Sequence, residues 1–250
     1  MRKSRLGVQL WSVHQDCAKD LEGTLAAIAK MGYEGVELAG THNRPGAEWV
    51  RMLKQNGLVA KSAHVGIDQM TPDRLQETMD TYGAFDCKCL IVPGLGGDYV
   101  KSADGFKWAA EIINKAAETG KKAGFRFGYH NHAFEFDAVD GVLPMDVLAQ
   151  NLKPEQVLQF DMGWVFHAGR DGVEWLKKYP GRSAFVHVKA HSATNPKAIL
   201  GADDVDWPTV LKACVDTGKA EWLIVEHENH KNAPMVSIEQ CLVYLKTVAP

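Results

Sequence analysis

The stretch Gly128–Phe136, which reads GYHNHAFEF, places two imidazoles and a carboxylate in an otherwise apolar, strand-like run. His130 and His132 are two residues apart, and side chains two apart on a strand point to the same face. Glu135 has the opposite parity, so it can join the two imidazoles only if the chain turns after His132. These residue types could bind a metal ion or transfer protons, and the elements around them must explain how they are positioned.

Short apolar runs, each followed by a helical pattern, recur at intervals of roughly 25–35 residues and predict repeated strand–helix units. The eight runs are Leu6–Val13, Gly35–Leu38, Val59–His64, Cys89–Val92, Arg126–His132, Val157–Asp161, Ala184–Lys189 and Trp222–Glu226. Between them, residues 21–31, 104–122 and 207–217 have helical spacing. Eight such units predict a single-domain (β/α)8 TIM barrel, an α/β fold, over residues 1–250.

A doubly wound open sheet is the alternative fold. It would usually carry a glycine-rich first turn for a phosphate group, and Gln9–His14 offers none. Pro93–Gly97 is glycine-rich but lacks the Lys–Ser/Thr ending of a phosphate loop, so we interpret it as a tight connection. The sequence therefore favours the barrel.

Polar and ionisable residues gather at the C-terminal ends of the predicted strands, where barrel enzymes carry their catalytic residues. They are Glu37, His64, His130, Asp161, His187, Lys189, Glu226 and Glu228. A single buried histidine or glutamate is more often a hydrogen-bonded structural residue than a ligand. Burying several unpaired charges together costs several kcal/mol each, whereas a divalent cation would neutralise the carboxylates. The pattern therefore favours a metal site.

The chain resembles the sugar phosphate isomerase/epimerase family, the xylose-isomerase-like TIM barrels, along almost its whole length. The resemblance rests on Gly128–His132, Phe160–Trp164, His187–Lys189, Gly201–Trp207 and Val225–Glu226. It implies one divalent metal ion with one ligand from each of the last four strands, namely His130, Asp161, His187 and Glu226. Two nitrogens and two oxygens suit Mn²⁺ or Zn²⁺, and also Co²⁺ or Fe²⁺, better than Mg²⁺ or Ca²⁺.

Two positions depart from the family pattern. Many members have Glu in place of His130, where it is one of two opposed bases, and His in place of Trp164. A metal-bound histidine has no free lone pair, so another residue must transfer protons. The candidates are Glu226, which is our first choice, His132, Glu135, Lys189 and Glu37.

Residues at or just beyond the strand ends are also expected to contact the substrate. They are Trp11, Glu37, His64, Trp164 and His191. Trp11 and Trp164 could stack on a sugar ring, although packing at the barrel mouth is an equally good interpretation. Trp49, Trp108 and Trp175 fall in helical stretches and are expected in the core.

The resemblance implies an isomerase or epimerase that acts on a keto-sugar or sugar derivative through proton abstraction and a metal-stabilised enediolate. Loss of a β-substituent after the same first step would instead give a lyase or dehydratase acting on a 3-oxo-glycoside or inosose-like substrate. A third possibility is a non-catalytic sugar-binding barrel or a subunit of a larger complex. The sequence leaves these alternatives open.

Charge, hydropathy and cysteine content argue against several other classes of protein. The formal net charge is −3 with no basic run, which argues against nucleic acid as a partner and against the related abasic-site endonucleases. No segment reaches the roughly 20 apolar residues of a membrane span. Five scattered cysteines, including Cys87 and Cys89, indicate buried thiols and not a disulfide framework. We expect a cytoplasmic protein with a small carbohydrate substrate, and the family also makes a homo-oligomer possible.

Overall fold

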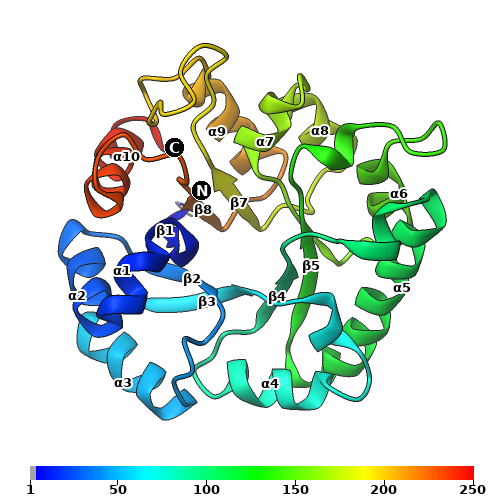
Figure 1. Cartoon of the computed structure of the whole chain (residues 1–250), viewed down its shortest axis with the longest axis horizontal. Coiled ribbons are helices and arrows are strands. Elements are labelled where there is room, and N and C mark those ends of the chain that lie inside the picture. The colour runs from blue at the N-terminus through cyan, green and yellow to red at the C-terminus, as the bar shows by residue number, and fades with distance from the viewer. Residues whose placement is uncertain (1–3) are drawn as a thin grey trace.

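The computed structural model describes residues 4–250. In this part of the chain, parallel strands form the centre and helices surround them (Figure 1). The strands are β1 (Arg5–Gln9), β2 (Gly35–Ala39), β3 (Val59–His64), β4 (Cys89–Val92), β5 (Arg126–His130), β6 (Val157–Gln159), β7 (Phe185–Val188) and β8 (Trp222–Val225). Each predicted strand therefore exists.

Every strand is followed by at least one helix. The α-helices are α1 (His14–Lys19), α2 (Leu21–Met31), α3 (Gly46–Asn56), α4 (Leu75–Gly83), α5 (Ala103–Gly120), α6 (Pro144–Asn151), α7 (Met162–His167), α8 (Gly172–Lys178), α9 (Trp207–Asp216) and α10 (Pro234–Val248). Short 3₁₀ helices cover residues 10–13, 67–70, 97–100, 121–123 and 134–136. Within residues 4–250 no helix has the length and apolar character that a membrane span requires.

The sheet closes into a barrel. Hydrogen-bonded neighbours run in the order β6-β5-β4-β3-β2-β1-β8-β7, and every pair is parallel. A parallel bridge between Asp161 and His187 joins the two edges, where the His187 backbone N–H donates to the carbonyl of Phe160 at 2.9 Å. The TIM-barrel prediction is confirmed, and two of the predicted metal ligands form the seam.

Several strands end earlier than the sequence predicted. β1 stops at Gln9, whose side-chain oxygen accepts a hydrogen bond from the Trp11 backbone N–H at 3.1 Å. Beyond β6, Asp161 caps α7 by accepting from the Trp164 backbone N–H at 3.0 Å. Such local side-chain bonds to the backbone compete with the strand ladder, so apolar pattern alone placed these ends too late.

The core consists of the barrel interior and the layer between strands and helices. Cys89, Ile91, Val157, Phe185, Trp222 and Ile224 fill the interior. Trp49, Trp175 and the thiols of Cys87 and Cys89 are buried as predicted. The prediction for Trp108 is wrong. Its side chain is 54% exposed, because the neighbouring Ala109 and Ala110 supply the buried face of α5.

Arg182, just before β7, ties the end of α6 to the N-terminal side of the barrel. Its guanidinium donates to the carbonyl oxygens of Ala149 (2.6 Å), Lys153 (3.0 Å), Gln156 (3.3 Å) and Leu152 (3.4 Å). Carbonyl groups at a helix end have no partner within the helix. Arg182 therefore stabilises the fold at the end of the barrel opposite the predicted site.

We predict that Arg182→Met lowers the free energy of unfolding by about 2–4 kcal/mol, because it leaves several part-buried carbonyl groups without a donor. Urea unfolding measures the loss. The matched control is Arg74→Met, which removes an exposed arginine paired with Asp68 and should change stability by less than about 0.5 kcal/mol. Equal losses in the two variants would contradict the role of Arg182.

Candidate metal centre

The four predicted metal ligands lie together at the C-terminal end of the barrel. His130 ends β5 and His187 lies in β7, while Asp161 is the second residue after β6 and Glu226 directly follows β8. Each offers one ligand atom, and these atoms all lie within 4.8 Å of one another. All four side chains are buried. Four segments distant in the sequence thus contribute to one small polar centre.

Within the described residues 4–250, one atom of each of these four residues lacks a hydrogen-bond partner. The four buried atoms are His130 Nδ1, Asp161 Oδ2, His187 Nδ1 and Glu226 Oε2. His187 Nδ1 contacts Glu226 Oε2 without hydrogen-bond geometry and lies 3.9 Å from Asp161 Oδ2. Buried polar atoms are normally satisfied, so four unpaired lone pairs at one point fit a bound cation. The two nitrogens and two oxygens suit a divalent transition metal.

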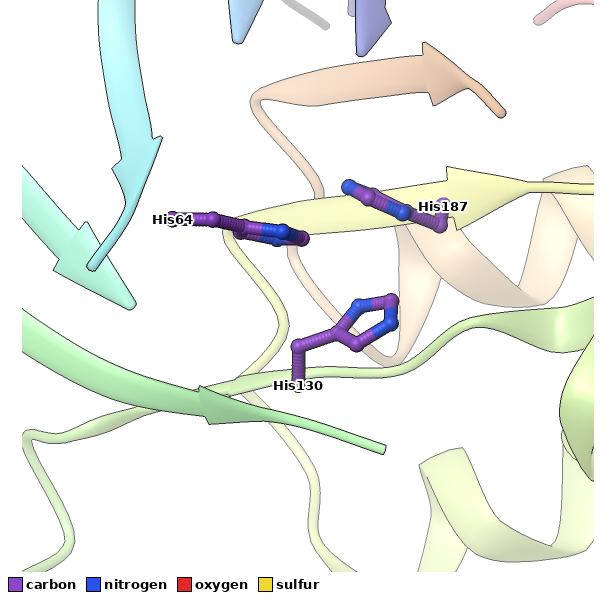
Figure 2. Close-up of side chains that lie close together, drawn as sticks. All are labelled: His64, His130 and His187. Carbon is purple, nitrogen blue, oxygen red and sulfur yellow. The ribbon is translucent and has the colours of Figure 1, made fainter. Parts of the chain in front are cut away.

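A second group of three imidazoles overlaps this centre. Figure 2 shows the rings of His64, His130 and His187 turned toward one another from three strands. The His64 and His187 rings are stacked at 5.3 Å. However, His64 Nε2 is hydrogen-bonded to Gln159 Oε1 at 2.8 Å. His64 thus has a hydrogen-bond partner, whereas His130, Asp161, His187 and Glu226 each have an unpaired atom. We therefore place His64 in the wall of the site and not among the ligands.

Glu37 forms the floor beneath His187. Its Oε1 accepts from His187 Nε2 (2.5 Å) and Gln9 Nε2 (2.8 Å), and its Oε2 accepts from Ser62 Oγ (2.5 Å) and Gln159 Nε2 (2.7 Å). An ionised carboxylate has about four acceptor positions, so none is left for a substrate. The structure thus places Glu37 beneath His187, with protein donors at its acceptor positions and His64 Nε2 3.1 Å from its Oε1.

The protonation of His187 follows from its two carboxylate neighbours. Burial alone would lower the pKa of His187, but Glu37 and Glu226 outweigh it and raise the pKa to about 10. Burial would raise the pKa of Glu226, yet Lys189 and His187 hold it well below its usual range. Glu37 binds the Nε2–H, which leaves Nδ1 as the nitrogen that faces Glu226. A metal ion would therefore replace a proton at Nδ1.

Lys189 lies beside the carboxylates of Glu226 and Glu228. Its Nζ contacts Glu228, lies 3.8 Å from Glu226 Oε1 and is 4.5 Å above the Trp164 ring. Burial would lower the pKa of Lys189, but Glu226, Asp161 and Glu228 outweigh it and raise the pKa. Lys189 is therefore a cation beside the site. Trp164 flanks that cation, and Glu228 binds it directly.

His132 and Glu135 have separate positions. The chain turns after β5 into a 3₁₀ helix, and Glu135 accepts from the Tyr129 hydroxyl (2.6 Å) and the His132 backbone N–H (2.8 Å). The His132 ring lies 5.0 Å from the His130 ring, and its Nδ1 has no partner. Burial lowers the pKa of His132, which favours a neutral imidazole. The His132 ring therefore lies beside the site, whereas Glu135 holds the backbone of His132 through a hydrogen bond.

The other two predicted contacts lie farther out. Trp11 is 50% exposed in the segment after β1 and stacks on His14 at 4.6 Å. His191 lies beyond β7, where its ring is 5.7 Å from that of His167 and its backbone N–H donates to Asp203. Within residues 4–250, no hydrogen bond, ion pair or ring contact joins either residue to the four ligands. Trp11 remains a rim position, and His191 belongs to the loop after β7.

The sequence alone assigns no role to Gln9, Ser62 or Gln159, and it places Glu228 only among the polar residues at the strand ends. Gln9 and Ser62 flank Glu37 across the β1–β2 and β2–β3 pairs, so only the strand register identifies them. Glu228 has the parity of Glu226, and that signal could have assigned it to the site.

The chain matches the family model described as "Xylose isomerase-like TIM barrel" over residues 25–247. This protein belongs to the xylose isomerase-like TIM barrel family. A relative named inosose dehydratase, from Clostridium perfringens, is 28% identical over 248 residues, which cover 83% of this chain and 82% of the relative. Another inosose dehydratase, from Geobacillus kaustophilus, is 25% identical over 187 residues, which cover 66% and 60%.

Solved structures share the fold. A sugar phosphate isomerase/epimerase from Parabacteroides distasonis superposes with a TM-score of 0.87 at 24% identity, covering 100% of this chain and 96% of the other. An L-ribulose 3-epimerase gives a TM-score of 0.75 at 15% identity, with coverage of 98% and 94%. At these identities the two superpositions establish the fold alone.

We predict that Glu37→Gln weakens Mn²⁺ or Zn²⁺ binding by about 10–100-fold, because an amide cannot accept all four hydrogen bonds and leaves His187 less fixed. Competition with a chelator measures the affinity. The matched control is Glu34→Gln, which changes an exposed carboxylate paired with Arg5 and should bind metal like the wild type. An unchanged metal affinity in Glu37→Gln would contradict the proposal that Glu37 holds His187 in position for metal binding.

The Glu135 carboxyl predicts a pH dependence of stability. Burial raises its pKa to about 7, although hydrogen bonds from Tyr129 and the His132 backbone oppose the shift. A carboxyl whose pKa rises on folding stabilises the fold when protonated, and this contribution is lost as the pH rises through 7. Glu135→Gln cannot ionise, and the Tyr129 hydroxyl can accept from its amide.

Relative to the wild type, Glu135→Gln should therefore gain on the order of 2 kcal/mol in the free energy of unfolding between pH 5 and pH 8. Urea unfolding at the two pH values measures the difference, in which shared titrations cancel. A difference that stays constant with pH would contradict the raised pKa of Glu135.

Proposed function

We propose that this protein is a divalent-metal-dependent enzyme that removes a proton from the carbon beside a ketone in a carbohydrate. The observation that carries the proposal is the convergence of unpaired ligand atoms from His130, Asp161, His187 and Glu226. A divalent ion held there would polarise the ketone and an adjacent hydroxyl and stabilise the enediolate left by proton loss. Mn²⁺ and Zn²⁺ are the proposed ions, with Co²⁺ and Fe²⁺ also compatible with the donor set.

His132 is the residue that we propose as the proton acceptor. A general base works best when it is neutral and has a free lone pair near the substrate. The His132 imidazole has a lowered pKa and an Nδ1 without a hydrogen-bond partner within residues 4–250, and its ring lies 5.0 Å from the His130 ring. Glu226, the first choice from the sequence, has a pKa well below its usual range and one oxygen directed at the centre. These properties suit a ligand better than a base.

Lys189 is proposed as a stabiliser of negative charge, because its raised pKa keeps it a cation. Its ammonium lies 3.8 Å from Glu226 and 4.5 Å from the Trp164 ring, at the edge of the ligand set. Lys189 directly follows β7, whereas His132 follows β5, so the two side chains come from the ends of different strands. Proton return to the neighbouring carbon would complete an isomerisation, and return on the opposite face would complete an epimerisation.

A second candidate function is elimination, in which loss of a hydroxyl or glycosyl group follows the same proton abstraction. Relatives named inosose dehydratase, up to 28% identical, favour it. The presence of His130 where many family members have a glutamate also favours it, because elimination does not require two opposed carboxylate bases. The substrate would then be an inosose-like ketone or a 3-oxo-glycoside.

Exchange in D₂O tests the proposal. The metal-depleted protein, reconstituted with Mn²⁺ or Zn²⁺, is incubated with a panel of keto-sugars, inososes and 3-oxo-glycosides and followed by NMR. We expect deuterium at one carbon beside the ketone. A returned substrate or its isomer indicates isomerase or epimerase activity, and an unsaturated product indicates elimination. His187→Ala should slow exchange by more than about 100-fold, whereas His167→Ala, at the exposed end of α7, should retain most of it.

The remaining alternative is a barrel that binds sugar without catalysis. Binding of a panel member without exchange in the Mn²⁺ and Zn²⁺ forms would support that alternative and contradict the proposed reaction. Equal exchange by the wild type and His187→Ala would contradict the proposed ligand set.

A further inference from the structure

A cavity lies at the end of the barrel opposite the candidate metal centre, around the N-terminal ends of the strands. Its volume is about 570 Å³. Arg5, Arg126 and Trp222 begin β1, β5 and β8, and Lys88 directly precedes β4. The candidate metal centre is at the C-terminal ends of the strands, so the two sites occupy opposite faces of the barrel.

The cavity concentrates positive charge. Its lining has five basic residues and two acidic ones, a balance of +3, in a chain whose formal net charge is −3. The basic residues are Arg5, Lys61, Lys88, Arg126 and Lys219, and the acidic ones are Asp86 and Glu221. A concave surface lined by one sign of charge focuses the electrostatic field and attracts ions of the opposite sign.

Two of the lysines have no carboxylate partner among residues 4–250. Lys88 Nζ donates to the carbonyl of Ala123 at 3.2 Å, and Lys219 Nζ donates to the carbonyl of Asp216 at 2.7 Å. An ammonium group has three donors, so each lysine retains N–H groups that can bind a ligand. In contrast, Lys61 contacts Asp86.

The arginines are held in place by aromatic rings of the barrel interior. The Arg5 guanidinium lies 4.5 Å from the Trp222 ring, and that of Arg126 lies 5.0 Å from the Phe185 ring. Arg126 also pairs with Glu221 at 2.9 and 3.3 Å, and Arg5 pairs with Glu34 at 3.0 Å. Stacked guanidinium groups lose less side-chain freedom when they bind a planar or tetrahedral oxyanion.

The backbone at this cavity is strained at two charged residues. Asp86 has φ of 60° and Lys219 has φ of 61°, a left-handed conformation that costs roughly 1 kcal/mol for a residue with a Cβ. Glycine would avoid that cost at either position. At Lys219 the chain instead carries an ammonium group that lines the cavity.

We propose that this cavity binds a small oxyanion with at least two negative charges, of the phosphate or phosphate-ester class. Lys88 and Lys219 supply the free ammonium donors, and Arg126 and Arg5 supply fixed guanidinium groups. Charge-assisted hydrogen bonds from such groups are about twice as strong as neutral ones. The ligand is separate from the carbohydrate substrate, so this proposal does not depend on the proposed reaction.

Calorimetric titration of the full-length protein with inorganic phosphate and with glycerol phosphate, at constant ionic strength, tests the proposal. We expect saturable binding that Lys88→Ala/Lys219→Ala weakens by at least about tenfold. The matched control is Lys30→Ala/Lys115→Ala, which removes the same charge from exposed positions on α2 and α5 and should bind like the wild type. Tighter binding of one titrant identifies free phosphate or an ester as the better ligand.

Glu221→Gln gives a test with the opposite sign. It removes a negative charge from the lining and frees Arg126, so it should tighten phosphate binding. Binding must also persist in His187→Ala, which distinguishes this cavity from the candidate metal centre. Absence of saturable binding up to about 10 mM phosphate, or equal weakening in the two double variants, would overturn the proposal.

Discussion

The four hydrogen bonds to the Glu37 carboxylate organise the functional end of the barrel. The donors are on β1, β3, β6 and β7, so one buried anion on β2 joins strands from around the whole sheet. The bond from His187 has the further effect of committing Nε2 to Glu37. Only Nδ1 can then face Asp161 and Glu226, and the geometry of the candidate metal centre depends on that choice.

The centre also coincides with the point where the barrel closes. Asp161 and His187 form the bridge between β6 and β7, and Asp161 caps α7 with its other carboxylate oxygen. Closure brings the β6 edge against β7, and this places ligands from distant segments within reach of one ion. The residues at the strand ends therefore position the ligand atoms. The apolar interior below them needs no functional side chains.

Much of this arrangement could be predicted from the sequence. Eight apolar runs with helical patterns between them predict the barrel, and polar residues at their C-terminal ends identify the faces that meet. The sequence could not show which side chains become hydrogen-bond partners across neighbouring strands. Glu37 was assigned to the substrate because the donors around it become neighbours only through the strand register. Trp108 was placed in the core because the alanines beside it, with less apolar surface, form the buried face of α5.

We propose that a single divalent ion is bound jointly by His130, Asp161, His187 and Glu226. Anomalous diffraction from crystals grown with Mn²⁺ or Zn²⁺ would locate such an ion. We expect one strong peak within about 2.0–2.3 Å of His130 Nδ1, Asp161 Oδ2, His187 Nδ1 and Glu226 Oε2. A peak coordinated by His64 in place of Asp161 and Glu226, or no peak at this end of the barrel, would contradict it.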